Sequence, residues 1–279
     1  MTSPTLTTPG VRAVARGARR TPPSPLRVLL AVLARDIKVT FTKDFGSFVV
    51  QIAAQPLLML FIFAKVLGAL GFTSDGLNDV LVPGTVSYSV FLAAMQAVSL
   101  PLVVEFGYTR EIEDRLMAPV RTSLIAVEKV AVAAVRGLIA MVLMFPAGEL
   151  VVGGVELHWS GLPLAVLVGF LGGWAGGAVG LIIGTFLPAN KVNIMYALIL
   201  APLLFTGCSQ YPWPSLARLP WFQVVTALNP MTYSSEGIRA AVVPQVPHLS
   251  VLVCLPALVG FCVLLTAIGI RGFRRRAMS

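Results

Sequence analysis

The chain has 279 residues, of which 57% are hydrophobic and 12% are charged, and its formal net charge is +9 at pH 7. A soluble domain carries about 25% charged residues, so this chain has too little polar surface for a soluble globule of its size. Its basic residues gather at the ends of apolar runs, which membrane orientation explains better than nucleic-acid binding does.

Residues 1–25 are rich in Ser, Thr, Pro and Arg and contain no apolar core. They are therefore not a secretory signal peptide, and we expect a disordered cytoplasmic tail. Residues 26–43 place most of their apolar side chains along one helical side and their basic side chains elsewhere. This pattern predicts a helix in the membrane interface, and an amphipathic helix packed on a soluble partner is the alternative.

Six apolar runs follow, each long enough to cross a hydrocarbon core of ~30 Å at ~1.5 Å per residue. We place these spans at 45–70, 83–104, 124–152, 163–187, 192–210 and 249–270. The sequence thus predicts an all-α integral membrane fold with six transmembrane helices.

An even number of spans puts both termini on one side of the membrane. That side holds seventeen of the 21 Lys and Arg residues and is predicted to be cytoplasmic. Of the remaining four, Arg218 and Arg239 are expected on the opposite side, and Lys65 and Arg136 near span ends.

A charge-dense segment separates the second and third spans. Residues 105–129 contain nine ionisable side chains, which cannot lie in hydrocarbon and must face water or a soluble partner. Ile112 and Leu116 are four residues apart, as on one face of a helix, and Pro119 ends that helix. Thr122 or Ser123 can cap the next one. A solvated loop between two spans is the alternative interpretation.

The fourth span contains two glycine ridges with a spacing of four residues. One is Gly169, Gly173 and Gly177, and the other is Gly172, Gly176, Gly180 and Gly184. Such ridges let membrane helices approach closely, so we expect them to serve helix packing. No lysine follows a glycine anywhere in the chain, so it lacks a nucleotide-binding G-x-x-x-x-G-K-[ST] loop.

Polar side chains are few within the spans, and each needs a partner in lipid. Hydrogen bonds between helices are the simpler interpretation. The alternative hypothesis is that Gln51, Gln55, Gln96 and Ser99 line a substrate path at a subunit interface.

The stretch from Phe205 to Val243 is not a clean span, because four prolines break it into pieces too short to cross a membrane. We expect helices at 216–228 and 233–243, forming a re-entrant outer hairpin within 211–245. Glu236 and Arg239 are three residues apart and can pair on one helical face. Cys208 is expected to be accessible from outside. With three scattered cysteines and two histidines, the chain suggests neither a disulfide framework nor a metal site.

Two of these motifs resemble ABC type-2 transporter permeases. The acidic helix, Leu-x-x-Pro-Val-x-x-Ser and the following Glu-Lys resemble that family's cytoplasmic coupling segment, here 105–121. The matching residues are Arg110, Glu111, Asp114, Leu116, Pro119, Val120, Ser123 and Lys129. The outer segment resembles the family's re-entrant motif at Gly207, Pro212, Pro220, Asn229, Pro230, Tyr233, Glu236 and Arg239. The Cys208–Tyr211 stretch is more polar than that pattern.

The resemblance covers nearly all of the chain beyond residue 25 and makes 26–279 one transmembrane domain, most similar to drug and lipid exporters such as daunorubicin-resistance permeases. It implies a plasma (inner) membrane subunit without catalytic residues, cofactor or metal of its own. ATP and Mg²⁺ would bind to two partner ATPase subunits, and a second permease copy or paralogue would complete the dimer among membrane lipids. The substrate would be drug-like or lipid-like, and transport would be outward.

The sequence argues against two other classes of protein. An ion-coupled secondary transporter normally places Asp, Glu or Arg at the membrane midplane, and none is clearly there. For an integral-membrane lipid-modifying enzyme or protease, H-E-x-x-H is absent and Gly207–Tyr211 lacks the second glycine of a nucleophile elbow.

Overall fold

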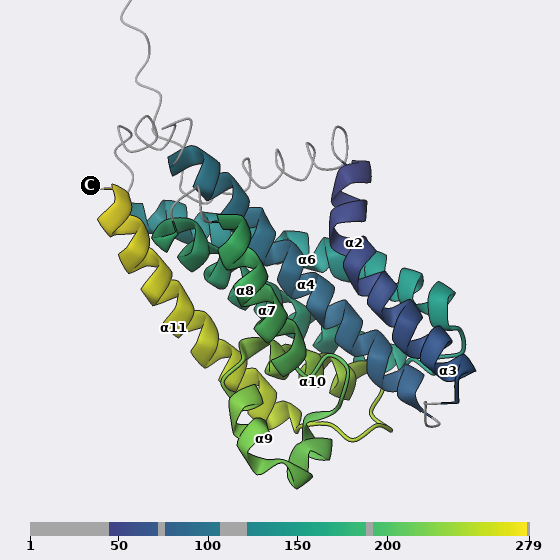
Figure 1. Ribbon diagram of the computed structural model, residues 1–279. Coiled ribbons are helices and arrows are strands. Elements are labelled where there is room, and N and C mark those ends of the chain that lie inside the picture. The colour runs from purple at the N-terminus through teal and green to yellow at the C-terminus, as the bar shows by residue number, and fades with distance from the viewer. Residues whose placement is uncertain (1–44, 72–75, 107–121, 188–191, 278–279) are drawn as a thin grey trace, which may run out of the picture.

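The computed structural model describes residues 45–71, 76–106, 122–187 and 192–277 (Figure 1). The expected tail 1–25 and interfacial helix 26–43 lie outside these ranges. Within the described ranges every regular element is helical and no strand occurs. Five helical stretches there are long and apolar enough to cross a membrane, so the chain is a multi-pass membrane protein.

The first span is continuous but not uniform. It runs from Val49 to Ala69 through three helical segments. These are α2 (Phe45–Phe61), the π-helix η1 (Ile62–Val66) and α3 (Leu67–Ala69). The other span-length helices are α4 (Leu77–Val104), α6 (Thr122–Val152), α7 (Leu162–Phe186, preceded by the 3₁₀ turn η3 at Trp159–Gly161) and α11 (Val251–Ala277).

Two span boundaries differ from those expected. Helix α4 begins at Leu77 rather than at 83 and continues through Pro83, since neighbouring groups in a membrane protein can satisfy the carbonyl that a proline leaves unpaired. Helix α11 runs to Ala277 rather than to 270, with three arginines in its last turn. Cations are favourable there because the carbonyl end of a helix carries partial negative charge.

The fifth expected span, 192–210, corresponds to α8 (Val192–Thr206), which has 15 residues. At ~1.5 Å per residue it is about 22 Å long, which is shorter than a ~30 Å hydrocarbon core. The helix ends where Gly207 and Cys208 turn the chain, and Cys208 adopts the left-handed conformation with φ of 50°. The sixth span therefore stays a prediction.

Helices α4 and α7 lie at the centre of the bundle. Helix α7 contacts α4, α6, α10 and α11, and α4 also contacts α2, α6 and α10. The short helices α9 (Pro220–Ala227) and α10 (Pro230–Val242) lie at the end of the bundle opposite the C-terminus (Figure 1).

The helices of the outer segment begin at prolines instead of the positions expected. The predicted helix 216–228 is divided into the 3₁₀ turn η5 (Trp213–Arg218) and α9, and the helix predicted at 233–243 begins at Pro230. Proline suits the first turn of a helix because the N–H that it lacks would have had no partner there.

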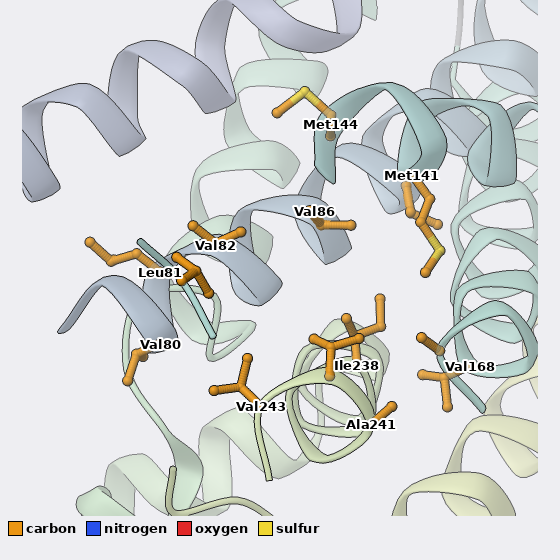
Figure 2. Packing of buried hydrophobic residues seen from close by; sticks show 14 of the residues in the cluster. Val80, Leu81, Val82, Val86, Met141, Met144, Val168, Ile238, Ala241 and Val243 are labelled. Carbon is orange, nitrogen blue, oxygen red and sulfur yellow. The ribbon is translucent and has the colours of Figure 1, made fainter. Parts of the chain in front are cut away.

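Helix α10 is buried although it is too short to span a membrane. Figure 2 shows Ile238 and Ala241 of α10 beside Val168 of α7, in a cluster that also contains residues of α4 and α6. Such a cluster needs α10 inside the end of the bundle, where protein covers its backbone.

The two glycine ridges of α7 face different helices. A Cβ at Gly173 would lie 3.1 Å from the Ala134 Cα of α6, and one at Gly177 would lie 2.9 Å from the Ala133 Cβ. On the other ridge, a Cβ at Gly176 would lie 2.6 Å from the Phe91 carbonyl oxygen of α4. The remaining ridge glycines would meet Met141 of α6 (Gly169), Ser234 of α10 (Gly172), and Met95 and Leu102 of α4 (Gly180 and Gly184).

We predict that Gly176→Ala and Gly180→Ala each destabilise the chain by roughly 1–3 kcal/mol, because each new methyl group would overlap a backbone carbonyl of α4. Thermal unfolding of the purified chain in detergent measures this effect.

The matched control is Gly260→Ala in α11, where a Cβ would meet nothing within 4 Å. It should leave stability unchanged or raise it by up to about 1 kcal/mol, because alanine favours helix more than glycine does. If Gly180→Ala unfolds at the same temperature as wild type, α4 and α7 do not need this close approach.

Candidate functional site

An ion pair joins the two helices that flank residues 107–121. Lys129 Nζ of α6 lies 2.9 and 3.0 Å from the two carboxylate oxygens of Glu105, which caps the end of α4. The side chains of Lys129 and Glu105 are only 17% and 12% exposed, so water screens the pair less than it screens a surface pair. The predicted coupling residues Arg110, Glu111, Asp114, Leu116 and Pro119 lie outside the described residues, but this pair fixes the helices on either side of them.

The end of α11 is attached at the same place. Arg276 Nη1 donates to the carbonyls of Gly184, Thr185 and Leu187, at 3.2, 3.0 and 2.9 Å, where α7 ends. These carbonyls have no partner within the helix, and a cation is favoured beside them. The guanidinium also lies 4.8 Å from the centre of the Phe106 ring, directly after Glu105. Sequence reasoning used Arg276 only to orient the chain.

At the opposite end, Asn229 positions α10 through three hydrogen bonds. Its side-chain oxygen accepts from the Met231 N–H at 2.9 Å, as an N-cap residue does, and Pro230 follows at the first helical position. Asn229 Nδ2 donates to the Leu203 carbonyl and to Thr206 Oγ1, both at 2.9 Å. The Asn-Pro pair therefore starts α10 and ties it to the end of α8.

Other residues of the predicted outer motif make local contacts around α9 and α10. Tyr233 donates from its hydroxyl to the Ala227 carbonyl at 2.9 Å, which joins α10 to α9. A Cβ at Gly207 would lie 2.7 Å from the Leu203 carbonyl oxygen and equally close to the Met231 sulfur. Pro212 directly precedes η5, and Pro220 opens α9.

Glu236 and Arg239 form an ion pair with both side chains fully buried. The Glu236 carboxylate also accepts from the Trp213 N–H at 2.9 Å and from the Leu249 N–H at 2.7 Å. Arg239 Nη2 donates to the Cys208 carbonyl at 2.9 Å and to the Val80 carbonyl at 3.4 Å. The pair thus links α10 to η5, to the chain entering α11, to α4 and to the turn after α8.

Burial lowers the pKa of Arg239, although the adjacent Glu236 carboxylate opposes that shift. Sequence spacing indicated the pairing of these two residues, but not its burial or its four backbone partners.

Cys208 is also fully buried, so the expected accessibility of its thiol is wrong. Its carbonyl is turned toward Arg239, and its side chain is covered by protein.

The residues of the hypothetical substrate path line different parts of the bundle. Gln51 and Gln96 line a cavity of about 150 Å³ between α2, α4 and α6. Gln55 lines a second cavity of about 490 Å³, mainly apolar, between α2 and α8. Ser99 is buried, lines neither cavity, and donates to the Met95 carbonyl at 2.8 Å within its own helix.

Arg136 also lines the smaller cavity, and its expected position is wrong. It was expected near a span end, but it lies near the middle of α6, which extends from Thr122 to Val152. The expected span 124–152 already contained the signal, because Arg136 is far from both of its ends. A charged residue at this position marks a functional site more often than a structural one.

Comparison with known protein families identifies a match over most of the chain. The family model described as "ABC-2 type transporter" matches residues 27–243, from the predicted interfacial helix to the residue after α10. No curated protein matches the chain.

The buried ion pair generates a prediction for stability. Glu236→Leu and Arg239→Leu should each lower the free energy of unfolding by about 3–5 kcal/mol, because each leaves an unpaired charge inside the protein. The double variant should lose less than the sum of the two single losses. Thermal and denaturant unfolding in detergent measure all three.

Arg218→Leu is the control, because Arg218 is exposed in η5 and its loss should leave stability unchanged. Additive losses in the double variant would show that the two charges do not stabilise each other.

Proposed function

The chain belongs to the ABC-2 type transporter family, and from this membership we propose that it is the membrane-spanning permease subunit of an ATP-binding-cassette exporter. Two separate ATPase subunits bind ATP and Mg²⁺, and a second permease copy or paralogue completes the complex. The substrate is an amphipathic drug-like or lipid-like molecule that leaves the cell. The observation that carries the proposal is the family match over 27–243.

The coupling segment 105–121 binds the ATPase subunit through Arg110, Glu111, Asp114, Leu116 and Pro119. Force applied there reaches α4 and α6 through the Glu105–Lys129 ion pair, and α7 and α11 through Arg276. Helices α4 and α6 also line the 150 Å³ cavity, so movement at the coupling end changes the walls of a cavity that contains three polar side chains.

The proposed topology has six spans, with α8 as the fifth and 211–245 as the re-entrant outer segment. Both termini are cytoplasmic, and the protein lies in the plasma (inner) membrane. Lys129 and the arginines of the last turn of α11 lie at the coupling end, whereas α9 and α10 lie at the other (Figure 1). An excess of basic residues marks the cytoplasmic side.

An ion-coupled secondary transporter is the alternative function. Arg136 lies near the middle of α6, so a lack of charged residues at the membrane midplane no longer argues against a secondary transporter. The family match argues against that class instead. A lipid-modifying enzyme has less support still, since we assign no catalytic residue. Among the described residues, no cluster of His, Cys, Asp and Glu suits a metal ion.

The orientation can be tested by cysteine labelling. The three native cysteines are buried, so the unmodified chain should react slowly with a membrane-impermeant maleimide. Ser160→Cys, in exposed η3, should be labelled on intact cells, whereas Arg274→Cys, exposed near the end of α11, should be labelled only after permeabilisation. The reverse pattern would place the termini outside.

The coupling role predicts the effect of charge reversal. Glu111→Arg combined with Asp114→Arg should weaken ATPase binding and abolish substrate-stimulated ATP hydrolysis, because like charges facing each other across an interface cost several kcal/mol. Insertion and permease dimerisation should be intact. Co-purification with the ATPase subunit and ATP hydrolysis in proteoliposomes provide the two measurements.

The matched control is Glu156→Arg, which reverses an exposed acidic residue at the opposite end of the bundle. It should leave ATPase binding and hydrolysis at wild-type levels. If the Glu111/Asp114 variant also co-purifies and hydrolyses normally, these two acids are only a solvated surface.

A further inference from the structure

The cavity between α2, α4 and α6 is lined by one polar side chain from each helix. Gln51, Gln96 and Arg136 line it, and the rest of its wall is apolar. Two residues of the wall reach the surface, since Gln51 is exposed and Leu100 is 39% exposed. The cavity therefore opens sideways from the bundle, toward the membrane.

The depth of the cavity follows from positions along the helices. Gln51 is six residues after the start of α2, and Gln96 is eight residues before the end of α4. At ~1.5 Å per residue these positions are about 9 and 12 Å from the helix ends. Arg136 is seven residues from Lys129, and Gln96 is nine residues from Glu105, the partner of Lys129 in the ion pair, so Arg136 starts no deeper than Gln96. Its side chain also leans toward the N-terminus of α6, which is the coupling end. All three side chains thus converge at the depth of the cytoplasmic leaflet.

The chemistry of the lining selects a ligand. A guanidinium is suited to binding phosphate or carboxylate oxygens, and this preference is strongest where water is scarce. Gln96 Oε1 is buried and accepts no hydrogen bond from the described residues. A ligand that fits this site should therefore also donate a hydrogen bond. A head group with an anionic centre and an O–H or N–H donor satisfies both side chains.

The volume of the cavity limits how much of a ligand can enter. Drug-sized molecules occupy sites of about 300–1,000 Å³, whereas a 150 Å³ cavity in another protein holds a molecule the size of benzene. The present cavity is also about 150 Å³ and accommodates a head group but not a whole drug or lipid. The sideways opening leaves the apolar remainder of the ligand in the bilayer.

We propose that this cavity binds the hydroxyl-bearing anionic head group of an amphiphile, whose apolar part remains in the cytoplasmic leaflet. Arg136 binds the anion, and Gln96 accepts from the hydroxyl or amine. The inference rests on the proposed export function, since it assigns that exporter a class of substrate.

Lipid binding to the purified full-length chain tests the proposal without the ATPase. Phosphatidylglycerol, which carries a phosphate anion and hydroxyls, is titrated against phosphatidylcholine and against inorganic phosphate, and native mass spectrometry measures affinity. Wild type should prefer phosphatidylglycerol to phosphatidylcholine, and inorganic phosphate should not displace the lipid. Arg136→Gln and Gln96→Leu should each weaken phosphatidylglycerol binding about tenfold, or about 1.4 kcal/mol, and Arg136→Lys should retain most of it.

Arg218→Gln is the control for net charge, because it removes one positive charge from exposed η5 and should bind as wild type does. Equal binding of both lipids by wild type overturns the proposal, and so does wild-type affinity in Arg136→Gln. Displacement by inorganic phosphate would assign the cavity to a free anion instead. If Arg136→Gln does not fold, the affinity of Gln96→Leu decides the question.

The export function and the binding site can fail separately. If the Glu111/Asp114 variant binds and stimulates the ATPase normally and keeps its lipid preference, the coupling mechanism is wrong and the binding site stands. If wild type shows no lipid preference but the coupling prediction holds, the binding site is wrong and the export function stands.

Discussion

The buried Glu236–Arg239 ion pair holds together the end of the bundle opposite the C-terminus. Both charges are removed from water, which costs several kcal/mol for each ion unless good geometry and further hydrogen bonds offset it. Here the further hydrogen bonds come from the backbones of Trp213, Leu249, Cys208 and Val80. Four chain segments are therefore fixed relative to one short helix, and the left-handed turn at Cys208 is held by one of the same contacts.

Close backbone packing provides the second constraint. The glycines of α7 bring its backbone next to α4 on one side and α6 on the other, which leaves no room there for a side chain or a ligand. Space within the bundle occurs instead where α2 lies against other helices, and the two larger of the cavities that α2 lines are about 150 and 490 Å³. A tight centre formed by α4, α6 and α7 thus has cavities at its edge, beside α2.

The end of the bundle that carries the C-terminus is connected differently. Glu105 and Lys129 join α4 to α6, and Arg276 joins α11 to α7 and to Phe106. Among the described residues the Glu105–Lys129 pair is partly exposed, whereas the pair at the other end is fully buried.

The sequence by itself determined the membrane class, the positions of the span-length helices, the family and the two glycine ridges. Each depends on local composition or spacing, such as long apolar runs or the i, i+4 recurrence of Gly169, Gly173 and Gly177. Tertiary structure decided which helix each ridge faces, that Cys208 is covered, and that Gln51 and Gln55 line separate cavities. It also brought Arg136 beside Gln96, although the two are forty residues apart on different helices. Burial and cavities arise from segments distant in the chain, and their packing is not encoded in the spacing of any one of them.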